Sequence, residues 1–185
     1  MLMVLLVITA FGAGAVPFGV LIARARGVSI QEHGSGNIGA TNVTRVLGAR
    51  AGAIVLVLDA AKGALPTYLA LCLCGWPWVV AAAGAAAILG HCFSPFLRGR
   101  GGKGVATALG VFAVLTPTLI PVALGVFVVV LAVGRVPALG SLAAVATLAL
   151  ILVVLGVIPT ATLAVGTLLL LIYTHRTNLA KLRRR

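Results

Sequence analysis

The stretch VATALGVFAVLTPTLIPVALGVFVVVLAV, residues 105–133, decides how this chain folds. It is apolar almost throughout and is too long for one membrane helix, which needs about 20 residues, yet it is barely long enough for two. Pro117 and Pro121 stand near its middle. Because proline lacks an N–H donor and clashes with the preceding turn, it interrupts a helix. We therefore predict two short helices here rather than one kinked helix.

The remaining sequence extends this pattern in both directions. The chain is 62% hydrophobic and 9% charged with a mean hydropathy of +1.23, which excludes a soluble domain and indicates a polytopic membrane protein. The sequence predicts an all-α integral membrane protein with seven transmembrane helices, some of them short, in one membrane-embedded domain over residues 1–185. Trp76-Pro77-Trp78, Gly156 and Pro159 interrupt the other long apolar stretches and so mark the remaining helix boundaries. The expected spans are residues 2–23, 51–73 and 79–91, two within 105–133 and two within 139–174.

The positions of the basic residues test this count independently. The chain has 14 Lys and Arg against only two carboxylates. With seven helices and the N-terminus outside, all of these cations except Lys62 fall on one side, which the positive-inside rule makes cytoplasmic. If residues 105–133 formed one helix, Arg135 and the basic C-terminus would lie outside. We therefore expect a retained first helix, an outside N-terminus and a cytoplasmic C-terminus.

One acid and one base lie inside an expected span. Asp59 and Lys62 are three residues apart, so they share a helix face and can neutralise each other. Charges inside a membrane are costly and often functional, but a paired Asp and Lys is also a common structural solution. The sequence leaves both roles open, and it also allows Lys62 to extend its flexible stem toward the cytoplasmic surface.

The first polar segment, GSGNIGATNVTR, covers residues 34–45 and is called the Ser35 segment below. Ser35, Asn37 and Asn42 supply hydrogen-bonding groups, the glycines relax the backbone, and Arg45 adds a permanent charge with a planar donor fork. Such a density of donors in a chain with so few polar residues indicates an anion site more than a flexible connector. A phosphate group would suit this set.

The second polar segment, GHCFSPFLRGRGGKGVAT, covers residues 90–107 and contains a glycine loop at residues 99–104. GRGGKG does not match the P-loop pattern GxxxxGK[ST], because residue 104 is Gly, so a nucleotide triphosphatase is disfavoured. A glycine-rich loop that runs into a helix near Val105 would still present N–H groups and a positive dipole end to an anion, with Lys103 adding charge. His91 could serve this site or simply pack against the loop.

The third polar segment is HRTN, residues 175–178, at the end of the last expected helix. His175 and Asn178 are three residues apart and would project from one face. Ser141, at the cytoplasmic start of the sixth span, is a further candidate hydroxyl. In the seven-helix arrangement all three polar segments face the cytoplasm.

Taken in order, SGNIGATN, the GH and GGKGVAT parts of the second segment, and HRTN resemble the acyl-phosphate:glycerol-3-phosphate acyltransferase (PlsY) family of bacterial membranes. The resemblance implies transfer of a fatty acyl group from acyl phosphate to the 1-position of sn-glycerol 3-phosphate, giving lysophosphatidic acid and phosphate. It departs from the family at Gly99, where an aromatic residue is usual, and at Ala138, where the family has Ser. The implied catalytic residues are His175, Ser35, Lys103 and Asn178, and the implied substrate-binding residues are Asn37, Asn42, Arg45, Gly101, Gly102, Gly104, Ser141 and His91.

The expected mechanism is direct transfer. The general base would be His175 or, as we favour, a phosphate oxygen of the substrate, since the resemblance implies no His-Asp pair. We expect no cofactor and no metal, because the three histidines are far apart in sequence and show no ligand spacing. The expected partners are the two small substrates and membrane lipid without nucleic acid, in a bacterial plasma membrane with the site facing the cytoplasm. The oligomeric state is not predicted.

Two other classes of function remain as alternatives. A phosphate or organic-anion transporter would use the same basic segments as a cytoplasmic vestibule, but no internal repeat is evident. A scaffold for anionic lipids would explain the charge but not the ordered Ser, Asn and Gly motifs. Acyl-CoA as the donor is disfavoured, because no His is followed by Asp five residues later.

Overall fold

The computed structural model describes residues 1–182, apart from the side chain of Lys181, and all regular elements in this part are helical. Residues 183–185, which belong to the predicted cytoplasmic cations, lie outside the described residues. The chain forms two compact units, the first over Met1–Val111 and the second from Phe112 onward. The α-helices are α1 (Leu2–Ala15), α2 (Phe18–Arg24), α3 (Ala40–Leu47), α4 (Ala49–Leu73), α5 (Pro77–Cys92), α6 (Val105–Leu115), α7 (Ile120–Gly134), α8 (Pro137–Val154), α9 (Ile158–Thr174) and α10 (Arg176–Leu182), with short 3-10 helices η1 (Ile30–Glu32), η2 (Pro95–Leu97) and η3 (Pro117–Leu119).

The interruption predicted within residues 105–133 is confirmed. α6 ends at Leu115, Pro117 begins η3, and Pro121 lies in the first turn of α7, where a missing N–H costs no helical hydrogen bond. The other predicted breaks are confirmed in the same way at Pro77 and Pro159. Among the described residues, five helices are long and apolar enough to cross a membrane, while α6 and α9 are shorter apolar helices.

The first predicted span, residues 2–23, is confirmed in its extent, because residues 2–24 are long and apolar enough to cross a membrane, but it is not one unbroken helix. The chain breaks at Val16 and Pro17, so that α1 ends at Ala15 and α2 begins at Phe18. Proline removes a donor and opposes the preceding turn, and here this local effect outweighs the uniform hydropathy of the segment. The connection between the first two predicted spans contains two further elements, η1 and α3.

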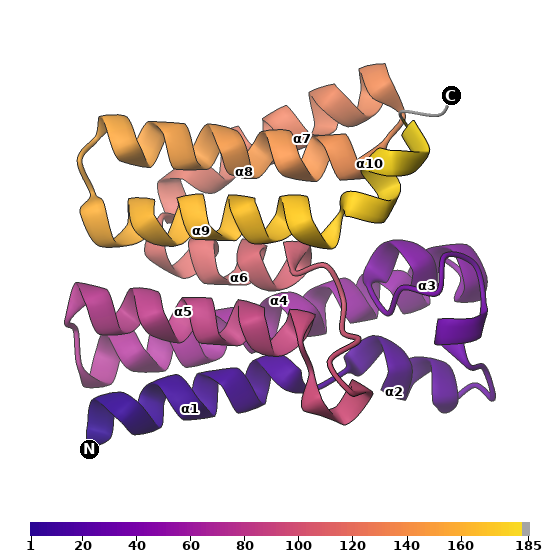
Figure 1. The fold of residues 1–185 in the computed structure, drawn as a ribbon, viewed down its shortest axis with the longest axis horizontal. Helices are drawn as coiled ribbons and strands as arrows, with labels where there is room; N and C mark the ends of the chain where they lie inside the picture. Colours follow the sequence, from indigo (N-terminus) through magenta and orange to yellow (C-terminus); the bar gives the residue numbers. More distant parts are fainter. Residues whose placement is uncertain (183–185) are drawn as a thin grey trace. The chain divides into compact units, whose positions relative to one another are not determined.

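In the first unit, α1, α4 and α5 run alongside one another (Figure 1). Glycines allow α1 and α5 to approach closely, because a Cβ added at Gly14 would collide with the carbonyl oxygen of Ala87, and one at Gly90 with that of Phe11. Membrane helices associate through such small residues, since lipid offers little hydrophobic drive between helices. This packing fixes the end of α5, to which the amides of Gly101 and Gly102 donate hydrogen bonds.

In the second unit, α8 packs against both α7 and α9 (Figure 1). Gly140 lets α8 approach α7, because a Cβ there would lie 3.0 Å from both the ring and the carbonyl oxygen of Phe127. The chain turns at Gly156, which adopts a left-handed φ of 68° between α8 and α9. Beyond α9, a turn at His175 leads into α10.

Candidate functional site

Asn42 organises the Ser35 segment. Its side chain is buried in the first turn of α3. The Oδ1 atom accepts a hydrogen bond from the Ser35 amide at 2.8 Å, and Nδ2 donates to the carbonyl oxygens of His33 at 3.0 Å and Asn37 at 2.9 Å. These bonds use the side chain to hold backbone, so Asn42 shapes the loop. Its predicted contact with substrate stays a prediction.

The other polar side chains of the Ser35 segment lie on its surface. Asn37 Oδ1 accepts a hydrogen bond from the Gly39 amide at 2.8 Å, at the start of α3. Ser35 and Arg45 are exposed, with Arg45 in the last turn of α3. The loop that Asn42 holds in place therefore presents a hydroxyl, and α3 beside it presents a guanidinium, which suits binding of an anion.

Gly101 and Gly102 fold back onto the end of α5. The Gly101 amide donates to the carbonyl oxygen of Cys92 at 3.1 Å, and the Gly102 amide donates to that of His91 at 3.0 Å. A Cβ at Gly101 would collide with the His91 carbonyl oxygen, and one at Gly102 with the His91 imidazole. Close approach of backbone therefore explains both glycines, and their two amides already satisfy the helix end. Their predicted role in phosphate binding stays a prediction.

The glycine loop carries two cations, the exposed Arg100 and Lys103, which directly precedes the last glycine. Lys103 is half-buried, and burial lowers the pKa of its ammonium group. Gly104 follows with a left-handed φ of 89°, and α6 begins at Val105. The loop thus places a lysine at the positive end of the α6 dipole, where an anion is favoured.

The predicted pairing of Asp59 with Lys62 is confirmed. Lys62 Nζ lies 2.8 Å from Asp59 Oδ1, and both side chains are buried in α4. Lys62 Nζ also donates to the carbonyl oxygen of Val16 at 2.7 Å, which holds the end of this buried side chain within the first unit. His91, also buried, has its Nδ1 3.8 Å from the same Asp59 oxygen.

The second unit carries the remaining predicted site residues. Ser141, buried near the start of α8, donates from Oγ to the carbonyl oxygen of Pro137 at 2.9 Å. His175 is buried at the turn between α9 and α10, with Nδ1 2.8 Å from the carbonyl oxygen of Leu171. A carbonyl oxygen can only accept, so Nδ1 carries a proton in this contact. The amide of Asn178, in α10, donates to the His175 carbonyl oxygen at 2.8 Å.

The Ser35 segment and the second polar segment, both in the first unit, pack against the same buried apolar cluster. Ile30, Ile38 and Val43 from the Ser35 region form a buried cluster with residues of α2 and α4, and Leu97 packs against it. Leu97 belongs to η2, two residues before the glycine loop. Segments that are far apart in sequence are therefore tied to a common core.

We did not predict from the sequence which side chains donate hydrogen bonds to the free carbonyl groups at the break between α1 and α2. Ser94 Oγ donates to the carbonyl oxygen of Ala15 at 2.6 Å, and Lys62 Nζ donates to the carbonyl oxygen of Val16. Pro17 was the available signal, because a proline inside an apolar stretch frees carbonyl groups that need donors in lipid.

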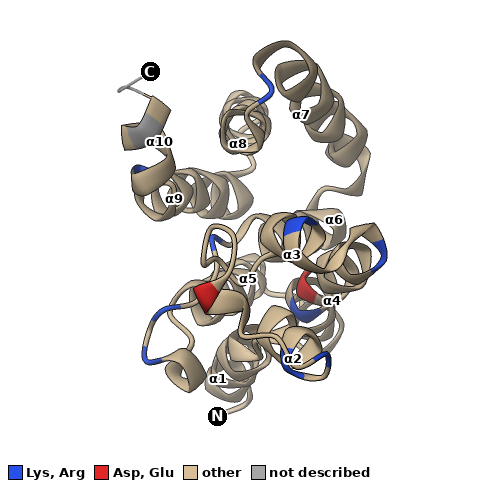
Figure 2. Ribbon diagram, turned by 90° about the vertical axis from the view of Figure 1, so that its right-hand side faces the viewer, with Lys and Arg blue, Asp and Glu red and all other residues tan. Residues whose placement is uncertain are grey.

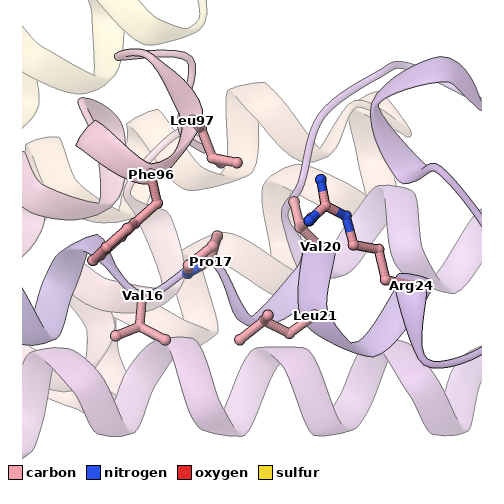
Figure 3. A pocket seen from close by; sticks show the side chains of 7 residues that line it. All are labelled: Val16, Pro17, Val20, Leu21, Arg24, Phe96 and Leu97. Carbon is pink, nitrogen blue, oxygen red and sulfur yellow. The ribbon is translucent and has the colours of Figure 1, made fainter.

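An apolar groove of about 260 Å³ lies beside this break (Figure 3). Val16 and Phe96 lie at one end and Arg24 at the other. An alkyl chain suits such a lining, and Arg24 could meet an anionic group at its end. The groove is lined by Val16, Pro17, Val20, Leu21, Arg24, Phe96 and Leu97.

Positive charge surrounds these segments. In Figure 2, which looks onto the end of the first unit that carries α2 and α3, lysine and arginine positions lie on these helices and on the neighbouring loops. The net charge of +12 with only two carboxylates leaves little to oppose an anion. Among residues 1–182, no three His, Cys, Asp or Glu side chains gather as a metal site requires.

Comparison with known protein families shows which family the chain belongs to. The model of the family described as glycerol-3-phosphate acyltransferase matches residues 4–185. The chain belongs to the glycerol-3-phosphate acyltransferase family. The resemblance seen in the three motifs is thereby confirmed.

Individual family members agree along almost the whole chain. The glycerol-3-phosphate acyltransferase of Myxococcus xanthus is 50% identical over 183 residues, covering 97% of this chain and 95% of that protein, and that of Geotalea daltonii is 42% identical over 183 residues, covering 97% and 93%. A solved structure of PlsY (YgiH), an integral membrane glycerol 3-phosphate acyltransferase in its glycerol 3-phosphate form, matches with a TM-score of 0.96 at 38% identity and covers 100% of this chain and 93% of that one. The lysophosphatidic acid form of PlsY matches with a TM-score of 0.94.

Proposed function

We propose that this protein transfers a fatty acyl group from acyl phosphate to the 1-hydroxyl of sn-glycerol 3-phosphate, the first acylation step of phospholipid synthesis. The observation that carries the proposal is the likeness, over the full chain, to a PlsY structure in its glycerol 3-phosphate form. The ordered motifs of this sequence support the same reaction.

The chemistry of both substrates matches the polar segments. Each substrate carries a phosphate group, so a site for them needs cations and donors and few carboxylates. Arg45 offers a bidentate fork, and Lys103 stands at the start of α6. We propose that these two residues bind phosphate groups, with Ser35 and Asn37 contributing hydrogen bonds.

In the proposed step, the 1-hydroxyl oxygen of glycerol 3-phosphate attacks the carbonyl carbon of acyl phosphate. A new ester C–O bond forms, the bond from the carbonyl carbon to the phosphate oxygen breaks, and the hydroxyl proton ends on the departing phosphate. Acyl phosphate is already activated, so positioning and charge stabilisation supply most of the acceleration. A substrate phosphate oxygen accepts the proton in this proposal, and the imidazole of His175 is the alternative acceptor.

Ser141, His175 and Asn178 are proposed as further substrate-contacting residues on the strength of their motifs. We also propose that seven helices cross the membrane, with the N-terminus outside and the acyltransferase site facing the cytoplasm of a bacterial plasma membrane. The positions of the basic residues support this orientation.

The experiment is product formation by purified protein in lipid, given sn-glycerol 3-phosphate with either palmitoyl phosphate or palmitoyl-CoA. We expect lysophosphatidic acid from palmitoyl phosphate alone, and loss of activity in Lys103→Ala. Arg50→Ala is the matched control, since Arg50 is an exposed cation at the start of α4 outside the proposed site. Product from palmitoyl-CoA alone would overturn the proposed donor. No product with either donor from folded protein would overturn the reaction and direct attention to anion transport.

A further inference from the structure

The break between α1 and α2 is completed by donors from distant parts of the first unit. Ser94 Oγ donates to the Ala15 carbonyl oxygen at 2.6 Å, and Lys62 Nζ donates to the Val16 carbonyl oxygen at 2.7 Å. Lys62 Nζ also lies 5.7 Å from the centre of the Phe18 ring, within range of a cation–π interaction. Lys62 therefore contacts both sides of the break and fixes where α2 begins.

α2 in turn supports the Ser35 segment. A Cβ at Gly19 would collide with the carbonyl oxygen of Ile38, so the helix backbone lies directly against that segment. Val20 and Ile38 are buried in the same apolar cluster. The position of the Ser35 segment thus depends on the position of α2.

The same lysine is linked to the glycine loop on its other side. Its partner Asp59 lies 3.8 Å from His91 Nδ1, and all three side chains are buried. The opposite edge of the imidazole, at Nε2, lies so close to Gly102 that a Cβ there would collide with it. Gly102 directly precedes Lys103 in the chain, so a side chain packed on Gly102 affects where Lys103 stands.

We infer that Asp59, Lys62 and His91 form a positioning cluster that holds the Ser35 segment and the glycine loop at a fixed separation. Simple neutralisation of charge within α4 needs only Asp59 and Lys62. It does not require the bond to Val16, the packing on Phe18 or the contact of His91 with Gly102, which join the cluster to both polar segments. The inference rests on the proposed function for its kinetic consequence, but its structural consequence is independent of it.

The first test is hydrogen exchange of the full chain in lipid nanodiscs, with Asp59→Asn/Lys62→Met as the principal variant. This pair removes both charges together, so that no unpaired charge remains in the membrane. We expect faster exchange in residues 33–39 and in residues 98–104. The control is Thr67→Val, which removes a buried hydrogen bond of 2.7 Å to the Gly63 carbonyl oxygen on the same helix, and it should change neither segment.

His91 gives a second and more local test. His91→Ala should speed exchange in residues 98–104 and leave residues 33–39 unchanged, because the ring supports only the glycine loop. His91→Gln, which keeps a polar group of similar length, should restore part of the protection. Should the double variant fail to fold, this pair still decides the inference: unchanged exchange at residues 98–104 in His91→Ala would overturn it.

Kinetics separates this inference from the proposed function. We expect the folded double variant to raise the KM for glycerol 3-phosphate about tenfold, with a smaller change in kcat, since it displaces binding groups without removing them. Unchanged exchange in both segments of the folded double variant, or equal changes in Thr67→Val, would overturn the positioning role. Absence of acyltransferase activity in the wild-type protein would overturn the proposed function alone.

Discussion

At the scale of single residues, side chains divide into those that hold the backbone and those that face outward. Asn42 belongs to the first group, because its amide is bonded to backbone of the Ser35 segment. Arg45 belongs to the second, because it is exposed on α3. Their roles in activity should therefore be separable by measuring stability alongside kinetics.

Replacement of Asn42 tests this division. Asn42→Ala removes the hydrogen bonds to the Ser35 amide and to the carbonyl oxygens of Ile30, His33 and Asn37, each of which contributes about 0.5–1.5 kcal/mol to stability. We expect a lower thermal unfolding temperature together with a loss of acyltransferase activity. Thr41→Ala, a change at the exposed neighbouring position, should leave the unfolding temperature unchanged. An Asn42→Ala protein with wild-type stability would contradict the account.

The pKa of Lys103 predicts a dependence on pH. Burial lowers that pKa, so the ammonium loses its proton at a lower pH than an exposed lysine would. Above about pH 7 the phosphate of glycerol 3-phosphate is already ionised, and a rise in its KM then reports the loss of the enzyme's charge. We expect KM to rise as the pH increases, and this rise to move to higher pH in Lys103→Arg, because a guanidinium stays protonated. Identical pH profiles for both proteins would remove Lys103 from the phosphate site.

At the scale of helices, close contacts between small residues fix how α4 and α6 pack. A Cβ at Gly110 would collide with the carbonyl oxygen of Ala60. We expect Gly110→Ala to destabilise the protein by about 1–3 kcal/mol, because overpacking forces backbone to move. The matched control is Gly12→Ala in α1, where nothing lies within 4 Å of the added Cβ. Thermal unfolding in lipid measures both, and equal unfolding temperatures would contradict this packing.

The helix boundaries show what the sequence can predict. Pro77, Pro117 and Pro159 interrupt helices through local sterics, so their effects could be predicted from sequence alone. The pairing of Asp59 with Lys62 is equally local, since it depends only on helical spacing. The same steric effect applies at Pro17, but the high hydropathy around it led us to predict a single continuous helix.

The rest of the candidate site could not be predicted, because it depends on contacts between distant residues. The bond from Lys62 to Val16 spans 46 positions, and the bond from Ser94 to Ala15 spans 79. Nothing in residues 99–104 alone shows that the amides of Gly101 and Gly102 end α5. Sequence motifs thus identified the polar segments, whereas tertiary packing determines which of their groups hold backbone.

At the scale of the whole molecule, the seven-helix topology makes opposite predictions at two positions. With residues 105–133 divided into two spans, residue 134 lies in the cytoplasm and residue 155 lies outside; with one span there, the two exchange sides. We expect an impermeant thiol reagent added to intact cells to label Leu155→Cys and not Gly134→Cys, in protein whose native cysteines are replaced by Ala. The reverse pattern would contradict the topology.

The net charge of the whole chain also bears on the binding of anions. A chain with a net charge of +12 can concentrate anions at a membrane surface. The treatment of residues 1–185 as one acyltransferase domain stays a prediction. Salt should raise the KM for glycerol 3-phosphate if this general attraction contributes, since ions screen exposed charges.

The most direct test of the central claim is a single-turnover experiment with palmitoyl phosphate labelled in the acyl group, glycerol 3-phosphate and excess enzyme, quenched on the millisecond scale. We predict that label passes to lysophosphatidic acid at the rate at which phosphate is released, in equal amounts, with none on the protein at any time. Label that appears on the protein before lysophosphatidic acid forms, or phosphate released without that product, would contradict direct acyl transfer.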